Sequence, residues 1–540
     1  MKDISSTGSF INFYLNNYIY VDKTKYIRDL IKLERVFISR PRRFGKSLTL
    51  DTIATLFETG VEPYFKGTWI YDKWTEPTYP VLRLNFLDLD KYSLEHFKQK
   101  LNAIISSFAR DINVKNYEEK VEPEDTIYFL LDELRKEKRQ IVILIDEYDC
   151  QMTANINNET LYKQFQEKIK SFYATIKNKW PIKFLGITGV TRLKDVEIFS
   201  IGSDINDITN DSVYSQMIGF TRDEIKRYYI DYLKLAASYE NKCRVEEVID
   251  TQIESMLDMM AQNYDGYCFD EFYKKKVFST WSVNKFFQSV VSNKFVYFGE
   301  YWYDNGGLPS ILVNYLKTHE LNIFEYLDKD KFLKVSSDDF KNPTALTTIN
   351  QNVLMCQTGY LTLRSDLNKT STVALGIPNG EIYKALNRLL ANNIFKGNTD
   401  ITDDYGRSLL EVGTVDDIIN LFNSALNSVS YDNYPIVSES SVQNMLKLYL
   451  LGAHQKVLSE VHEAKGRADL VVNTDNRRIV FEFKYAKNET EAKSKLLDAV
   501  EQIKTRDYGN IVPKKTELLR IAAVFNADPK VRAFTEYQEV

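Results

Sequence analysis

The feature that most constrains this fold is an apolar run leading into a Gly-Lys-Ser turn and an apolar helical pattern, VFISRPRRFGKSLTLDTI at 36–53. Backbone N–H groups at the N-terminus of a helix, with a lysine beside them, bind anions such as phosphate. We therefore expect Lys46 to reach the β- and γ-phosphates of a nucleotide and Ser47 to bind Mg²⁺.

One position departs from the phosphate-loop pattern G-x-x-x-x-G-K-[ST], because Arg40 replaces its first glycine. That glycine relieves a tight turn, so an arginine there predicts an altered loop path, which Pro41 would help to set. Arg40, Arg42 and Arg43 add positive charge beside the phosphates. Three roles stay open for them: stabilising a transferring phosphoryl group, contacting an acid elsewhere in the chain, or lying in solvent.

Two later strands favour a nucleotide-binding fold. IVILIDEYD is an apolar strand that ends in Asp146 and Glu147, the positions of a Mg²⁺-binding acid and of a base that polarises the attacking water. FLGITGVTRL is a strand that ends at Thr188, with Arg192 just beyond it, where a sensor of the γ-phosphate would lie. In this order the phosphate loop and the two strand ends predict a P-loop domain.

The first third of the chain alternates short apolar strands with helical stretches, which is typical of a mostly parallel sheet covered on both faces. The predicted strands are 35–39, 79–86, 140–146 and 182–189, and the clearest helices are 92–111 and 158–178. From about 220 long amphipathic helices follow, such as TRDEIKRYYIDYLKLAASY. Around 340–390 a helix, a two-strand hairpin and another helix make a candidate winged-helix module.

The C-terminal region returns to an α/β pattern of helix, strand, hairpin, helix and strand. We therefore predict three regions: a P-loop domain with a parallel sheet sandwiched by helices, a helical linker region with the candidate winged helix, and a C-terminal α/β domain. Their boundaries are 1–235, 236–425 and 426–540.

Composition excludes several other classes of protein. A chain of 540 residues is expected to hold about two to four domains. The net charge of −5 leaves no overall basic footprint for nucleic acid, so such contact would need a local patch. No segment approaches the roughly 18 apolar residues of a membrane span, and MKDISSTGSF lacks the apolar centre of a signal peptide. Four scattered cysteines argue against a disulfide framework and favour the cytoplasm.

A second candidate site lies in the C-terminal region. In RIVFEFKYA, strand alternation places Glu482 and Lys484 on one face. The preceding strand GRADLVV folds back as a hairpin, which brings Asp469 near Glu482. Asp-x₁₂-Glu-x-Lys is the PD-(D/E)XK pattern, with Ala468 in place of the proline. Acidic ligands for a metal, with a lysine that positions water, are what phosphodiester cleavage requires. The alternative is an amphipathic strand with a solvated Glu–Lys pair.

Other residues around the hairpin stay candidates. Glu439, in the first turn of the preceding helix, is a further metal ligand, and Glu460 on the strand between is a second possibility. Lysines and arginines are nearly balanced by acids from 430 to 540, so no strong footprint for DNA is visible. The basic residues beside the hairpin either contact phosphates or solvate its turn; they are Lys465, Arg467, Arg477 and Arg478.

Several motifs together resemble the bacterial AAA-ATPase-like family, whose members typically carry a C-terminal PD-(D/E)XK nuclease domain. They include YVDKTKYI, RPRRFGKS, LIDEYD, ITGVTRLKDVEIFS, GFTRDEI and VFSTWSVNKFF, and the resemblance covers nearly the whole chain. It implies that Arg40 is usual at its position, that Asp22 and Lys23 lie near the nucleotide pocket, and that Gln502 and Tyr508 belong to the family's Q-I…Y element.

The patterns and the resemblance predict an ATPase coupled to a Mg²⁺-dependent nuclease, with ATP and Mg²⁺ as cofactors. The expected nucleotide ligands are Arg42, Arg43, Phe44, Gly45, Lys46, Ser47, Leu48, Asp146 and Asp22. The expected catalytic residues are Glu147, Arg192, Asp469, Glu482, Lys484 and Gln502. The expected metal ligands are Ser47, Asp146, Glu439, Asp469 and Glu482.

The expected partner is nucleic acid, DNA in preference to RNA. A homo-oligomer of this chain is also possible, and no membrane contact is expected. Two alternatives remain open. One is a nucleotide-gated switch or scaffold whose nuclease-like domain binds without cutting. The other is a nuclease whose ATPase domain is only structural.

Overall fold

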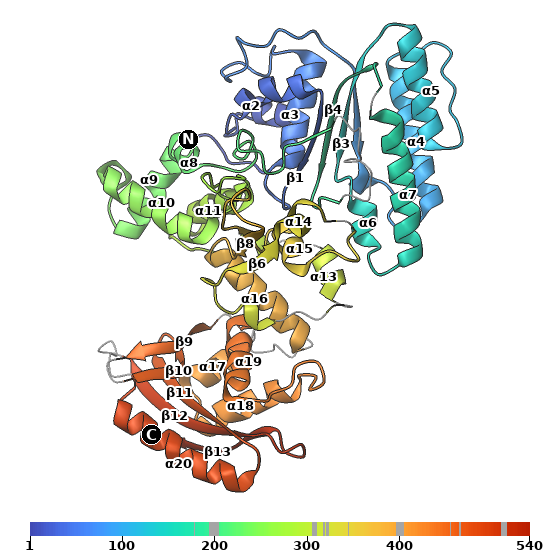
Figure 1. The fold of residues 1–540 in the computed structure, drawn as a ribbon. Coiled ribbons are helices and arrows are strands. Elements are labelled where there is room, and N and C mark those ends of the chain that lie inside the picture. Colours follow the sequence, from blue (N-terminus) through green and yellow to red (C-terminus); the bar gives the residue numbers. More distant parts are fainter. Residues whose placement is uncertain are drawn as a thin grey trace. The chain divides into compact units, whose positions relative to one another are not determined.

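The chain divides into two compact units (Figure 1). Unit 1 comprises Met1–His319 and Phe332–Ile382, and unit 2 comprises Glu320–Lys331 and Tyr383–Val540, so the predicted region 236–425 contributes to both. The computed structural model describes residues 1–177, 179–193, 205–304, 310–316, 319, 323–343, 345–395, 404–453, 455–463, 466–508 and 516–540.

Unit 1 is built on a parallel sheet of five strands in the order β2-β3-β4-β1-β5. The strands are β1 Arg35–Ser39, β2 Val81–Asn85, β3 Ile141–Asp146, β4 Ile182–Gly189 and β5 Asn206–Asp207. β4 lies between the phosphate-loop strand β1 and the acid-tipped strand β3, as in ASCE-type folds. The predicted parallel sheet is confirmed, whereas β5 was not predicted because two residues give no periodic signal.

Helices cover both faces of this sheet, as Figure 1 shows, with α2 and α3 on one side and α4, α5 and α7 on the other. Their amphipathic patterns bury one side of each helix against the strands or against a neighbouring helix. The helices of this part are α1 Phe10–Leu15, α2 Thr24–Leu30, α3 Lys46–Thr59, α4 Leu94–Asp111, α5 Pro123–Lys136, α6 Cys150–Ala154 and α7 Glu159–Ile176.

A helical layer with its own apolar core follows the sheet. It contains α8 Arg222–Tyr228, α9 Ile230–Asn241, α10 Asp250–Tyr264 and α11 Thr280–Asn293. The sequence predicts one helix through TRDEIKRYYIDYLKLAASY, but the structure breaks it at Tyr229. The buried Tyr229 ring stacks on Phe287 with centroids 5.3 Å apart, and its hydroxyl donates to Asn284 Oδ1 at 2.7 Å. These contacts with α11 offset the lost helical turn.

A small antiparallel sheet completes unit 1. Its strands are β6 Leu333–Ser336, β7 Thr362–Leu363 and β8 Thr372–Gly376, in the order β6-β8-β7. The predicted hairpin of the candidate winged helix is therefore confirmed, and β6 adds an unpredicted strand to it. The helices here are α12 Tyr301–Asp304, α13 Ser310–Leu316, α14 Ser337–Lys341 and α15 Gln351–Gln357. The next helix, α16 Gly380–Ile394, begins in unit 1 and lies mostly in unit 2.

Unit 2 contains a five-stranded mixed sheet in the order β13-β12-β11-β10-β9. Its strands are β9 Lys456–Glu463, β10 Gly466–Asn473, β11 Arg477–Ala486, β12 Glu517–Asn526 and β13 Ala533–Glu539, and its further helices are α17 Asp404–Val412, α18 Val415–Asn427, α19 Glu439–Gly452 and α20 Glu489–Arg506. β10 and β11 form the predicted antiparallel hairpin, and β11 pairs with β12 in parallel. The predicted nuclease-type α/β fold is confirmed, with β13 as an unpredicted edge strand.

Two predictions from composition can be compared with this fold. The four cysteines are all free, as their scatter in the sequence predicts. Among the described helices, none is both long and apolar enough to cross a membrane.

Candidate functional sites

The phosphate loop connects β1 to α3 in unit 1. Gly45 has a φ of +103° and precedes the first residue of α3, a conformation that residues with a Cβ rarely adopt. Its carbonyl accepts the Thr49 N–H at 3.0 Å, so helical bonding starts at once. The positive end of the α3 dipole therefore lies at the loop, as anion binding requires.

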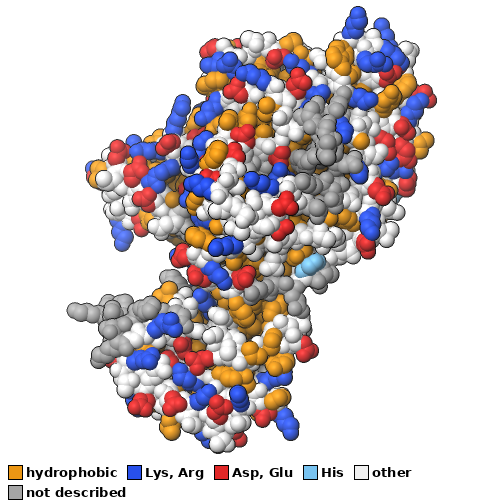
Figure 2. Space-filling view, viewed as in Figure 1, with side chains coloured by type: hydrophobic (Ala, Val, Ile, Leu, Met, Phe, Trp, Pro, Cys, Tyr) orange, Lys and Arg blue, Asp and Glu red, His pale blue; other side chains and the backbone are white. Residues whose placement is uncertain are grey.

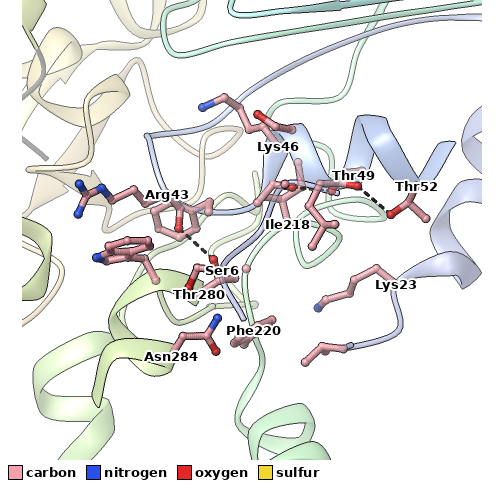
Figure 3. A pocket seen from close by; sticks show the side chains of 18 of the residues that line it. Ser6, Lys23, Arg43, Lys46, Thr49, Thr52, Ile218, Phe220, Thr280 and Asn284 are labelled. Carbon is pink, nitrogen blue, oxygen red and sulfur yellow. Dashed lines mark hydrogen bonds between the residues drawn. The ribbon is translucent and has the colours of Figure 1, made fainter. Parts of the chain in front are cut away.

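A cavity of about 330 Å³ adjoins this helix terminus. From the phosphate loop it is lined by every residue from Arg42 to Thr49. The opposite walls come from residues 5–8 and 217–220. The start of α11 closes the cavity beside the loop, where the Thr280 hydroxyl donates to the Arg43 carbonyl at 2.9 Å (Figure 3). The expected ligands Phe44, Gly45, Ser47 and Leu48 thus share one cavity with Lys46.

The walls from 5–8, 217–220 and α11 were not predicted as part of the site. GFTRDEI and VFSTWSVNKFF had appeared only as family motifs, without a role. These two motifs were the signal available in the sequence. Gly219 and Phe220 of the first motif line the cavity, and so do Thr280, Trp281 and Asn284 of the second.

Lys46 is buried and bonded within the protein. Its Nζ donates to the carbonyl oxygens of Arg40 at 3.0 Å and Pro41 at 3.3 Å. It also lies 3.6 Å from Oε1 of Glu147. The lysine predicted to bind phosphate and the glutamate predicted to polarise water therefore face each other in this cavity.

Glu147 follows the end of β3 with a φ of +53°, an uncommon conformation for a residue with a Cβ. Burial raises the pKa of its carboxyl group, and the charge of Lys46 opposes that shift. Asp146 lies beside it but does not line the cavity. Its Oδ1 accepts the Glu147 N–H at 3.0 Å and the Thr188 hydroxyl, which joins the ends of β3 and β4.

The three loop arginines have different surroundings. Arg42 lines the cavity. Arg43 also lines it, but its guanidinium lies 4.4 Å from the Trp281 ring and donates to the Tyr301 carbonyl. Arg40 is 1% exposed and points elsewhere, so of the roles left open for it, solvation is excluded.

Two expected residues lie away from the cavity. Arg192 pairs through Nε with Asp207 of β5. Asp22 accepts the Thr24 N–H at 2.9 Å and the Trp69 N–H at 2.6 Å, which are contacts within the N-terminal part of unit 1. Its neighbour Lys23 does line the cavity.

In unit 2 the structure brings the predicted acids and lysine together. Glu482 of β11 is 1% exposed, and its Oε1 accepts from Lys484 Nζ at 2.7 Å. The same Nζ lies 3.6 Å from Oε1 of Glu439, at the start of α19. Asp469 of β10 accepts the Phe483 N–H at 2.8 Å through Oδ2, which holds its carboxylate at β11.

Burial raises the pKa of Glu482 to about 7, and the negative charge of Asp469 adds to this shift. Its Oε2 is buried and has no hydrogen-bond partner. A buried carboxylate oxygen of this kind is stabilised by a cation or a proton. The oxygen donors of Asp469 and Glu482 therefore fit a hard divalent cation such as Mg²⁺.

The acidic set is small. Among the described residues no three His, Cys, Asp or Glu side chains lie grouped as metal ligands. The side chain of Glu460 and the whole of Lys465 lie outside the described residues.

Gln502 and Tyr508, which the resemblance assigned to one sequence element, are in contact, since Gln502 Nε2 donates to the Tyr508 hydroxyl at 3.2 Å. Arg506 was not predicted, yet its Nη1 donates to the same hydroxyl at 2.9 Å. This bond raises the pKa of Arg506, and the charges of Glu482 and Asp469 add to the shift. The i,i+4 spacing of Gln502 and Arg506 on one helix face was the available signal.

Of the basic residues beside the hairpin, Arg477 has a structural role. Its guanidinium binds Glu517 of β12 at 3.0 Å and the Gly413 carbonyl at 2.7 Å. On the face drawn in Figure 2, Lys and Arg are interspersed with Asp and Glu. Basic contact with a nucleic acid would therefore be local on this face.

Comparison with known proteins adds two family matches. Residues 5–199 match the model of a predicted AAA-ATPase, described as AAA-ATPase-like, and residues 437–534 match that of the PD-(D/E)XK nuclease superfamily. An uncharacterized protein in the vnfD 5′ region of Azotobacter chroococcum mcd 1 is 25% identical over 533 residues, or 95% of this chain and 94% of that protein.

Two solved structures were also found. Cdc6p from Pyrobaculum aerophilum has a TM-score of 0.26 at 12% identity, over 68% of this chain and 92% of its own. Orc1 from Aeropyrum pernix, solved in complex with DNA, has a TM-score of 0.26 at 10% identity, over 71% and 97%. Because both TM-scores are low, the fold of this chain is assigned from its own sheet topology and not from these structures.

Proposed function

We propose that this chain, which joins an AAA-ATPase-like domain to a C-terminal domain of the PD-(D/E)XK nuclease superfamily, hydrolyses ATP in unit 1 and cleaves nucleic acid in unit 2. The observation that carries the ATPase half is one cavity lined by Glu147 and by every residue of the phosphate loop from Arg42 to Ser47. Its volume of about 330 Å³ is in the range of small-molecule sites.

In this proposal the N-terminus of α3 and the loop N–H groups hold the phosphates of ATP. Lys46 leaves the loop carbonyls and donates to the β- and γ-phosphates. Ser47 and Asp146 hold Mg²⁺, which neutralises phosphate charge when bound. Glu147, released from its lysine partner, accepts a proton from the attacking water.

The remaining walls of the cavity receive the nucleoside. They combine apolar surface from Met217, Ile218 and Phe220 with polar groups from the N-terminal segment 5–8. Apolar walls with a few placed polar groups are typical of ligand pockets.

In unit 2, Asp469 and Glu482 hold Mg²⁺, which supplies Lewis-acid stabilisation of the phosphate when bound. Lys484 orients the water that attacks phosphorus, and Glu439 keeps Lys484 in place through their 3.6 Å contact. Gln502 on α20 acts as a further catalytic residue of this site. We propose DNA, in preference to RNA, as the nucleic acid.

We further propose that the protein acts in the cytoplasm, where free cysteines are stable, alone or as a homo-oligomer.

The alternative is a nucleotide-gated switch whose nuclease-like domain binds nucleic acid without cutting it. The ion pair between Lys484 and Glu482 favours this alternative, because it occupies one carboxylate oxygen that a metal would need. The small acidic set among the described residues supports it as well.

One experiment separates these functions. The purified full chain is incubated with DNA or RNA and Mg²⁺, while ATP or a non-hydrolysable analogue is titrated. Cutting that depends on ATP and is lost in Glu482→Ala supports the proposal. ATP binding with no cutting of any substrate favours the switch, and cutting that persists in Lys46→Ala means that the ATPase domain is only structural. Cutting unchanged by Glu482→Ala rejects the nuclease site.

A further inference from the structure

The side chain of Arg40 lies in a second, small cavity of unit 1. This cavity measures about 40 Å³ and shares no lining residue with the nucleotide cavity. Its lining includes Arg192, Cys268, Phe269, Cys356 and Gln357. Arg40 itself is 1% exposed, so its charge is shielded from solvent.

The guanidinium of Arg40 is only partly satisfied. Its Nη1 donates to the carbonyl oxygens of Ser39 at 2.9 Å and Thr209 at 2.5 Å. The planar group also stacks 4.1 Å from the centre of the Phe269 ring. Its Nε and Nη2 are buried and have no hydrogen-bond partner. Buried donors without partners are rare in proteins, and they commonly mark a water or an ion.

Among the described residues, positive charge exceeds negative charge around the cavity. Burial lowers the pKa of Arg40 to about 9, so the side chain remains a cation at neutral pH. Asp207 is the acid whose charge favours the cation, but it already pairs with Arg192. The charge of Asp207 therefore acts on both arginines, and the described residues that line the cavity include no acid. A buried, uncompensated charge is costly.

We propose that this cavity binds one small inorganic anion of the chloride class, held by Nε and Nη2 of Arg40. A single water needs about 10–15 Å³, so about 40 Å³ admits a halide ion and excludes a nucleotide. The anion supplies both the missing acceptor and the missing negative charge, whereas a water supplies only the acceptor.

The site connects to the phosphate loop through the same residue. The carbonyl oxygen of Arg40 accepts from Lys46 Nζ, while its side chain holds the anion. An occupied site therefore fixes the start of the loop through a residue that does not line the nucleotide cavity. The inference does not depend on ATP hydrolysis or on nuclease activity.

The first test is thermal unfolding of the full chain as chloride replaces gluconate at constant ionic strength. We expect chloride to raise Tm by roughly 2 °C once it exceeds its dissociation constant tenfold. Arg40→Gln should lose this response. Arg43→Gln, a loop arginine outside the small cavity, should keep it.

The second test does not depend on the folding of a variant. Crystals of the unaltered chain grown in bromide should show an anomalous peak within hydrogen-bond distance of Arg40 Nε and Nη2. An equal Tm in chloride and gluconate, together with no anomalous peak, would overturn the proposal and identify the occupant as water.

Discussion

Nζ of Lys46 lies 3.6 Å from Oε1 of Glu147 and donates to the carbonyl oxygens of Arg40 and Pro41. The loop lysine is therefore satisfied by the protein itself. In the proposed function, ATP replaces these contacts with phosphate oxygens, and this exchange frees Glu147 to act as the base.

Lys46→Ala should weaken ATP binding at least tenfold, or by about 1.4 kcal/mol, because it removes a charge-assisted contact to the phosphates. Isothermal titration calorimetry with ATP and Mg²⁺ measures the change. Lys163→Ala is the control, since that side chain is exposed and forms an i,i+4 pair with Glu159. Equal affinities of Lys46→Ala and the unaltered chain would remove Lys46 from the site.

Glu147→Gln should leave ATP binding intact and slow hydrolysis at least about 100-fold, because the amide cannot accept the proton of water. Burial raises the pKa of Glu147, so less of it is ionised at a given pH than of an exposed carboxyl group. We therefore expect hydrolysis to increase with pH until that group is ionised. Steady-state phosphate release against pH measures this, and a flat profile would argue against Glu147 as the base.

The metal-free chain should lose stability as pH rises, because of Glu482. Its folded pKa of about 7 lies above its ordinary value of 4.5, so its contribution is present below about pH 4.5 and is lost as pH rises through about 7. The loss is on the order of 3 kcal/mol.

In thermal unfolding at pH 8, Mg²⁺ should raise Tm of the unaltered chain and have much less effect on Glu482→Gln. Glu489→Gln is the control, since Glu489 is an exposed residue on α20 and forms an i,i+4 pair with Lys493. The same response to Mg²⁺ in the Glu482 and Glu489 variants would mean that the ion binds elsewhere.

Arg506→Ala should lower affinity for DNA about tenfold in unit 2, because its charge lies near Asp469 and Glu482, where the phosphate would bind. Fluorescence anisotropy with labelled DNA in Ca²⁺ measures binding without cutting. Lys504→Ala, in the same last turn of α20, is the matched control. If both variants lose affinity for DNA equally, the loss comes from the lower positive charge of α20 and not from a contact of Arg506 with DNA.

Strand periodicity and short motifs predicted much of both folds. Four strands of unit 1 form at the short apolar runs that predicted them, the hairpin of unit 2 forms where it was predicted, and α20 spans the predicted 489–506. These features depend on neighbours in sequence. The strands missed were β5, β6 and β13, which are short or lie at an edge of a sheet, where the pattern is weak.

The pairing of Asp469, Glu482 and Lys484 also followed from the sequence, because a hairpin and a two-residue period determine which side chains are neighbours. The direction of Arg40 did not follow. Its side chain is held by Thr209, which is 169 residues away, and by the ring of Phe269.

The sequence by itself therefore determined most of the strands, the phosphate loop and the acidic pair. The tertiary structure decided which residues close the nucleotide cavity, where Arg40 and Arg192 point, and that Tyr229 breaks its helix. The physical reason is that periodicity records contacts within one element, whereas these features arise from contacts between elements far apart in the chain.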